Sequence, residues 1–125
     1  MRGCSGFASG VSALGLAGAL FLSGFALADD GWVTLAGVEI GPALSARHLV
    51  YEGGATQQFN ADGSTDYESG RPSRGSWRVE GERYCSIWPP SDRWACYRVE
   101  RSADGLALRF VAEDGSASVG RYDDL

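Results

Sequence analysis

The sequence predicts a mainly β protein, an antiparallel up-and-down meander of about eight short strands curled into a small barrel, with a short N-terminal helix. Turn signals recur about every 8–12 residues along most of the chain, and the segments between them alternate apolar and polar residues with a period of two. No gap between these segments is long enough for the crossover helix that parallel strands require. The turn signals are Gly53-Gly54, Asp62-Gly63, Gly70 to Gly75, Gly81, Pro89-Pro90, Asp104-Gly105 and Asp114-Gly115.

The first 28 residues have the layout of a secretory signal peptide. Arg2 gives a positive start, Phe7–Leu27 carries no charge, and Ala26-Leu27-Ala28 fits the small-x-small cleavage pattern. An uncleaved membrane anchor is the alternative, because an apolar run of about 20 residues can span a bilayer. We expect cleavage after Ala28, which leaves residues 29–125 as one small β-barrel-like domain in the bacterial periplasm or outside the cell.

The charge balance excludes several classes of partner. The chain has 11 basic residues, 16 acidic residues and one His. Loss of Arg2 with the signal peptide leaves ten basic residues, all Arg, and a net charge of −6. We therefore expect no binding to nucleic acid or to an anionic membrane surface, and no membrane span after cleavage. A single His excludes a multi-histidine metal site, and a chain without Lys has no P-loop.

Cysteine usage predicts one disulfide. Cys4 precedes the apolar run and leaves with the signal peptide, which leaves Cys85 and Cys96 as an even number in an exported chain. Such cysteines are expected to be oxidised, and only one pairing exists. A metal site is the alternative, but two cysteines and one distant His are a poor zinc ligand set.

The mature chain begins with an apolar segment, Trp32–Ser45, that contains Gly41-Pro42. Proline is tolerated at the first position of a helix and disrupts deeper ones. We therefore expect a short helix or turn near Pro42–Ala46, which would act as a lid or plug.

Eight strands are expected after this segment. Their interior side chains should fill most of a barrel of this size, which argues against a carrier of large ligands. The sheet must curl or close so that its edges are not left open. The candidate strands are Arg47–Tyr51, Ala55–Asn60, Ser64–Ser69, Ser76–Glu80, Arg83–Trp88, Trp94–Arg101, Leu106–Ala112 and Ser116–Tyr122.

The register of one hairpin follows if Cys85 lies directly opposite Cys96. Two of the resulting pairs are favourable, since aromatic cross-strand neighbours stabilise a sheet by about 0.2–1 kcal/mol each. The third pair places two like charges together and argues against this register. The pairs are Tyr84 with Tyr97, Ile87 with Trp94, and Arg83 with Arg98.

Two short motifs and two cysteines resemble those of a known group of proteins. Phe59-Asn-Ala-Asp-Gly63 and Gly75-Ser-Trp-Arg-Val79 are followed by Cys85 and then Cys96. This order is similar to that of small exported bacterial domains of unknown function. The resemblance implies a secreted β domain with one disulfide, and it brings no activity with it. The predicted architecture also resembles small inhibitor barrels and lipocalin-like folds, as a fold analogy only.

The loop between the cysteines is the first candidate binding surface. Trp88, Arg93 and Trp94 lie there beside Pro89-Pro90. Trp and Arg are common recognition anchors, and the prolines with the disulfide would hold them in place. The alternative is that both Trp side chains cap an open end of the barrel. We predict that the loop from Ser86 to Ala95 is the main recognition surface.

The loop from Gly70 to Gly75 is the second candidate. Its Arg71 and Arg74 lie in an acidic protein and could bind an anion or a carboxylate. The alternative is that both arginines are simply solvated.

No catalytic, metal or cofactor residue is assigned. His48 is the only histidine, and no nucleophile elbow accompanies it. Asp62, Asp104 and Asp114 precede glycines, where Asp serves turn geometry. Asn60–Asp66 faintly resembles a calcium loop but lacks the closing Glu. Sequence alone selects no acid pair for glycoside hydrolysis.

These observations favour an exported, non-enzymatic binding module that recognises a protein, a glycan or a small ligand through loops at one end. The alternatives are a carboxylate-based hydrolase and a structural component of the cell envelope.

Overall fold

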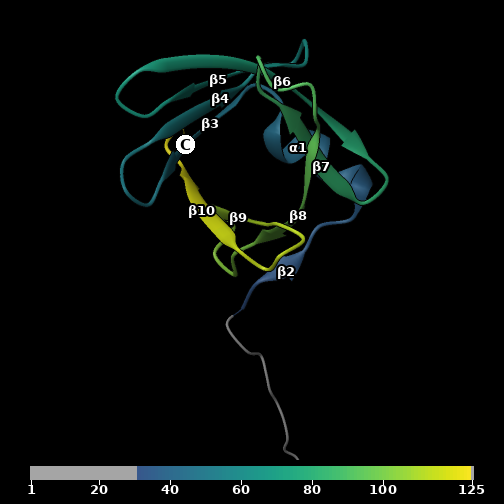
Figure 1. The fold of residues 1–125 in the computed structure, drawn as a ribbon. Coiled ribbons are helices and arrows are strands. Elements are labelled where there is room, and N and C mark those ends of the chain that lie inside the picture. The colour runs from purple at the N-terminus through teal and green to yellow at the C-terminus, as the bar shows by residue number, and fades with distance from the viewer. Residues whose placement is uncertain (1–30, 125) are drawn as a thin grey trace, which may run out of the picture. The chain divides into compact units, whose positions relative to one another are not determined.

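The computed structural model describes residues 31–124, and the expected signal peptide lies outside them. Figure 1 shows the ring of strands, with one short helix beside β6 and β7. The elements in chain order are β2 (Val33–Thr34), α1 (Gly37–Leu44), β3 (Arg47–Tyr51), β4 (Thr56–Phe59), β5 (Ser64–Glu68), β6 (Pro72–Glu80), β7 (Arg83–Ile87), β8 (Ala95–Arg101), β9 (Ala107–Val111) and β10 (Ala117–Tyr122). In the described part of the chain, no helix is long and apolar enough to cross a membrane.

Eight antiparallel strands form a closed barrel. Each strand from β3 to β10 pairs with the next, and β10 pairs back with β3, where Gly120 faces Tyr51. The prediction of a mainly β, up-and-down barrel is confirmed. The short strand β2, which we did not expect, lies outside this ring and pairs Val33 with Arg101 of β8.

One expected loop belongs to a strand. The segment from Gly70 to Gly75 was expected to be a loop, but β6 begins at Pro72, which lies opposite Glu68 of β5. Proline is tolerated as the first residue of a strand, because it does not need to donate a ladder hydrogen bond there. Gly75 continues the strand because a neighbouring indole occupies the space of a side chain, as described below. Only residues 69–71 connect the two strands.

The helix begins earlier than expected, with Pro42 inside it rather than at its start. The Glu39 carboxylate accepts a hydrogen bond from the Ala36 N–H at 2.7 Å, which caps the first turn. Proline removes one helical hydrogen bond. Three side chains at i, i+3 and i+4 spacing offset this cost by burial against the barrel, namely Ile40, Ala43 and Leu44.

The helix covers one end of the barrel. The Tyr122 hydroxyl at the end of β10 donates to the Ala43 carbonyl at 2.6 Å. Gly37 lies so close to the β6–β7 turn that a Cβ atom there would be 1.9 Å from the Gly81 carbonyl oxygen. The half of the barrel interior next to α1 is filled by a continuous core that includes Leu35, Leu44, Leu49, Phe59, Trp77, Val99 and Leu108.

The expected disulfide and hairpin register are present. Cys85 and Cys96 are bonded, with Cα atoms 4.0 Å apart, and they face each other across β7 and β8. Tyr84 faces Tyr97 as predicted. The β7–β8 ladder runs from the Tyr84–Tyr97 pair to the Ser86–Ala95 pair, so it includes neither the expected Ile87–Trp94 pair nor the unfavourable Arg83–Arg98 pair.

Two Asp-Gly turns have the chemistry that the sequence predicts. The Asp62 carboxylate accepts hydrogen bonds from the Ser64 backbone N–H at 2.9 Å and the Ser64 hydroxyl at 2.7 Å. Asp114 makes the same two contacts with Ser116, at 2.9 and 2.7 Å. The glycine between them has φ of 95° in the first turn and 90° in the second, a region that favours glycine.

Candidate functional site

A cavity of about 570 Å³ opens at the end of the barrel opposite α1. We call it the mouth cavity. Its volume lies in the range of about 300–1,000 Å³ that is typical of small-molecule sites. Its lining comes from every strand of the ring: Tyr51, Glu52, Ala55, Gln57, Tyr67, Ser73, Tyr84, Ser86, Trp88, Tyr97, Phe110, Ala117, Ser118 and Val119.

The existence of this cavity corrects the expectation that the barrel interior is mostly filled. Bulky core residues and α1 fill only the other half. Toward the mouth, several interior positions carry small side chains, which leave this end of the interior open. These positions are Ala55, Ser73 and Ser118.

Six of the fourteen residues that line the cavity are aromatic, and their side chains contact one another. The ring centroids are 5.9 Å apart for Tyr67 and Trp88, and 6.2 Å for Tyr51 and Tyr67. Tyr84 lies 5.9 Å from Tyr97 and 5.2 Å from Phe110. Because each ring is held by a neighbour, little side-chain ordering remains to be done when a ligand enters.

Gln57 links the hydroxyl groups at the bottom of the mouth cavity. Its Oε1 accepts from the Tyr51 hydroxyl at 2.6 Å, and its Nε2 donates to Thr65 Oγ1 at 2.9 Å and to the Tyr84 hydroxyl at 3.4 Å. Thr65 donates onward to the Gln58 carbonyl at 2.8 Å. Among residues 31–124 no buried side-chain polar atom lacks a partner, so this network is complete without a ligand.

Burial raises the pKa of two of the phenols that line the cavity. Burial raises the pKa of Tyr51 above its ordinary value, and the neighbouring tyrosines add to this effect. Burial also raises the pKa of Tyr84, against the opposing hydrogen bonds from Ser86 and Gln57. Both hydroxyls therefore stay protonated at neutral pH and contribute no charge to the cavity.

Trp88 forms the wall beside β6 and β7. Its Nε1 donates to the Ser86 hydroxyl at 3.2 Å. Its ring lies over Gly75, where a Cβ atom would be 2.7 Å from Trp88 Cε3 and 2.4 Å from the Ile87 carbonyl oxygen. The glycine thus makes room for the indole, which fixes the position of the side chain.

Arg93 and Trp94, the other two candidate residues of this predicted binding loop, do not line the cavity. Trp94 lies on the outer face, where the Arg78 guanidinium is 3.8 Å from its ring centroid. Arg93 is exposed on the loop, and its backbone N–H contacts the Ser91 hydroxyl at 3.2 Å. Only Trp88 of these three predicted residues belongs to the mouth cavity.

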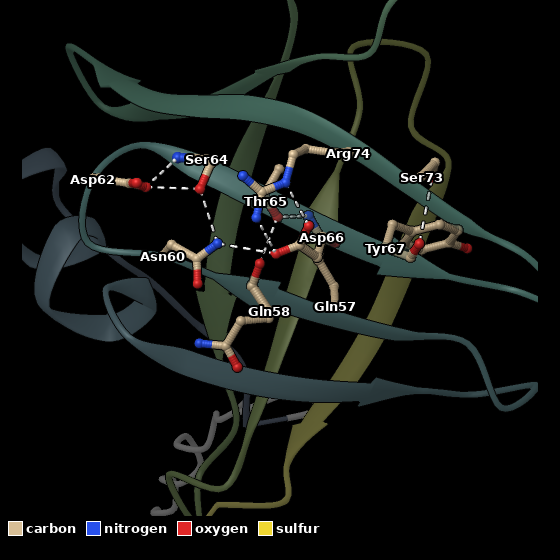
Figure 2. Close-up of polar contacts among 10 residues, drawn as sticks. All are labelled: Gln57, Gln58, Asn60, Asp62, Ser64, Thr65, Asp66, Tyr67, Ser73 and Arg74. Carbon is tan, nitrogen blue, oxygen red and sulfur yellow. Dashed lines mark hydrogen bonds and ion pairs between the residues drawn. The ribbon is translucent and has the colours of Figure 1, made fainter.

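The two arginines of the second predicted surface are also separated. Arg71 is exposed on the β5–β6 connection at the rim. Arg74 lies on the outer face of β6, where its Nε donates to the Asp66 carboxylate at 2.8 Å. Figure 2 shows this pair.

Polar side chains of the segment Asn60–Asp66 form hydrogen bonds with one another and with Arg74 (Figure 2). Asn60 Nδ2 donates to the Ser64 hydroxyl at 2.9 Å and to Asp66 at 3.1 Å. The hydrogen bond from Arg74, followed by that from Asn60, lowers the pKa of Asp66. These contacts account for the polar residues of this turn without a calcium ion.

The remaining chemically reactive candidates serve the structure. His48 Nδ1 lies 2.6 Å from Asp123 on the outer face, close to the C-terminus. Glu80 lies near both sulfurs of the disulfide, a spacing that would suit a metal ion if the cysteines were thiolates. Because Cys85 and Cys96 are bonded to each other, they are not available as thiolate ligands.

Sequence reasoning missed most of the lining, including Tyr51, Gln57, Tyr67 and Phe110. A usable signal was present: Tyr51 is the last residue of β3 and Tyr67 the second last of β5, and they lie on the faces that also carry buried Leu49 and Thr65. Tyrosine at the end of an inward-facing row is a typical lining residue, because it has an apolar ring and a polar tip.

Comparison with protein-family models, with curated proteins and with solved structures found no match to this chain. The resemblance to small exported bacterial domains therefore stays a prediction.

Proposed function

We propose that this chain is an exported binding protein that holds a small ligand in its mouth cavity. The observation that carries the proposal is the cavity itself, which has a volume of about 570 Å³ and a wall of six aromatic side chains. Large, well-formed, mostly apolar pockets with a few polar groups are the usual binding sites of small molecules. The sequence left a protein, a glycan or a small ligand as possible partners, and the proposal selects the small ligand.

The construction of the barrel supports this function. One end is covered by α1 and filled by the core, whereas the other end is open and lined by rings that hold one another in place. A rigid closed barrel with a ligand in its mouth is also the arrangement that lipocalin-like folds use, which is an argument from fold analogy.

The predicted periplasmic or secreted location agrees with the cross-link. A disulfide such as Cys85–Cys96 persists in oxidising compartments and is rare in the cytosol. A rigid scaffold with a preformed pocket would remain able to bind its ligand there.

The hydrolase alternative has less support. Glycoside hydrolysis uses two carboxyl groups at a set separation. Among the described residues that line the mouth cavity, Glu52 is the one carboxylate.

A neutral fluorescent probe tests the proposed function. N-phenyl-1-naphthylamine should become bright on mixing with the purified protein, because its emission rises in an apolar site. Ser118 faces Phe110 across β9 and β10 and lines the cavity, so Ser118→Trp places an indole in the mouth. We expect this variant to lose about tenfold or more in probe affinity.

Ser76→Trp is the matched control. Ser76 lies on β6, is exposed and does not line the mouth cavity. This variant should bind the probe as the wild type does, and melting curves will show whether both variants fold. Unchanged binding to the Ser118→Trp variant, or no probe binding to the wild type, would contradict the proposal.

A further inference from the structure

We propose that the ligand of the mouth cavity is a small organic cation, an amine or a quaternary ammonium compound with an apolar or aromatic body. This inference rests on the proposed function and adds the chemical class of the ligand. The observations that carry it are the aromatic wall and the charges that line the cavity.

The wall suits a cation. Tyr, Trp and Phe rings carry partial negative charge on their faces, which attract ammonium groups within about 6 Å, most strongly where water is excluded. Six such side chains face the mouth cavity: Tyr51, Tyr67, Tyr84, Trp88, Tyr97 and Phe110. The same rings offer the apolar surface that the body of the ligand would cover.

The only charged lining residue within residues 31–124 is an acid, Glu52. Glu52 is exposed at the rim of the cavity and makes no ion pair with another described residue, so it adds a negative charge where a cation would enter the mouth. The net charge of the whole chain is −5, so the field of the protein also attracts cations.

Most arginines are held away from the cavity by acidic partners on other faces. Arg83 pairs with Glu113 at 2.8 Å, and Arg109 pairs with Glu100 at 2.6 Å. Further pairs involve Arg47, Arg74, Arg78, Arg98 and Arg121. No arginine is among the described residues that line the cavity.

The positions of Arg71 and Arg93 favour an anionic ligand instead. Both are exposed in loops at the open end, but neither lines the cavity. A ligand that used them would lie across the rim rather than inside the aromatic wall. The two arrangements make opposite predictions about the charge of the ligand.

Three probes of matched size distinguish these possibilities: 2-phenylethylamine, which is a cation at neutral pH, neutral 2-phenylethanol, and anionic 3-phenylpropanoate. In calorimetric titrations of the purified protein, we expect the amine to bind about tenfold more tightly than the alcohol, and the anion to bind most weakly. Glu52→Gln should bring the affinity for the amine close to that for the alcohol, and it should leave the affinity for the alcohol unchanged.

Glu68→Gln is the matched control, because Glu68 is exposed at the end of β5 but does not line the cavity. It should keep the preference for the amine.

Equal or tighter binding of the alcohol or the anion overturns the inference and leaves the proposed function standing. Tight anion binding that is lost in Arg71→Gln or Arg93→Gln would assign an anionic ligand. Binding of N-phenyl-1-naphthylamine with no binding of any of the three also overturns the inference, whereas the absence of N-phenyl-1-naphthylamine binding to the wild type contradicts the proposed function itself.

Discussion

The two Trp residues of the loop between the cysteines lie on opposite sides of the barrel wall. Trp88 continues the inward row of β7 after Tyr84 and Ser86, whereas Trp94 precedes β8 on the same outward row as Cys96. Strand alternation explains this division, since residues two apart share a face. The prediction of one recognition surface does not account for this division, because the two ends of the loop belong to different faces of the barrel wall.

Gly75 provides a test at the scale of one residue. Gly75→Ala should displace the Trp88 ring and the β7 backbone, because the added Cβ would lie 2.7 Å from the ring and 2.4 Å from the Ile87 carbonyl oxygen. We expect a loss of about 1–3 kcal/mol in the free energy of unfolding. Urea denaturation measures this loss.

Gly41→Ala is the control for that substitution. Gly41 lies inside α1 and has no atom within 4 Å of its added Cβ. Alanine should therefore stabilise the helix by about 0.5–1 kcal/mol. If both variants unfold at the same urea concentration, the proposed contact between Gly75 and Trp88 does not constrain the wall.

At the scale of elements, the strand pattern could be predicted well because two independent signals agree. Asp-Gly turns fix where strands end, and alternation fixes which side chains point inward. The start of β6 was missed because Pro72 and Gly75 are typical of loops, and their environment in the sheet is a tertiary effect. Two-residue β2 is too short to show any periodicity.

The disulfide is the main covalent constraint on the hairpin of β7 and β8. Cys85→Ser/Cys96→Ser should lower the free energy of unfolding by about 2–4 kcal/mol, because the bond closes a short loop and restricts the unfolded chain. Guanidinium denaturation with and without a reductant measures this. The reductant should destabilise the wild type and leave the double variant unchanged; coincident curves without reductant would show that the bond constrains little.

The Asp turns predict a loss of stability in acid. Hydrogen bonds from Ser64, Ser102 and Ser116 lower the pKa values of Asp62, Asp104 and Asp114. A carboxyl group whose pKa is lower in the folded state than in the unfolded state stabilises the folded protein. The full contribution is present when the pH is above the pKa of the unfolded state, about 3.9, and it is lost as the pH falls through the pKa of the folded state. The melting temperature should therefore fall from about pH 4 downward.

Replacing all three aspartates tests that explanation. The triple Asp→Asn variant at positions 62, 104 and 114 keeps an oxygen acceptor in each turn but no longer titrates. Its melting temperature should change less between pH 5 and pH 2 than that of the wild type. This range is chosen because it extends about one unit or more on either side of the ordinary Asp pKa. Asp92→Asn, an exposed control without such a turn contact, should retain the wild-type slope. An unchanged slope in the triple variant would refute the role of the turns.

For the whole molecule, the closed barrel could be predicted but the cavity could not. Topology depends on turns and alternation, which the sequence displays directly. The volume of a cavity depends on which small side chains, such as Ala55, Ser73 and Ser118, meet around the ring near one end. That coincidence becomes visible only once the register of every strand is known.

Export is a property of the whole chain and has a direct test. Because Ala26-Leu27-Ala28 ends an uncharged run, we expect the exported protein to begin at Asp29. Mass spectrometry of the protein recovered from the periplasm or the medium will show its first residue. Recovery of the intact chain from Met1 in the membrane fraction would refute cleavage.

The central claim is that the ligand enters the mouth cavity rather than binding to the outer face of the loop. The most direct measurement is a ¹H–¹⁵N NMR titration of the indole N–H signals with 2-phenylethylamine and, in parallel, 2-phenylethanol. The chain has four Trp residues, so its indole signals are few and can be assigned by substitution. With at least one of the two compounds, the Trp88 signal should shift progressively while the Trp94 signal stays in place. A shift of Trp94 without Trp88, or no shift of Trp88 with either compound at saturation, would contradict the claim.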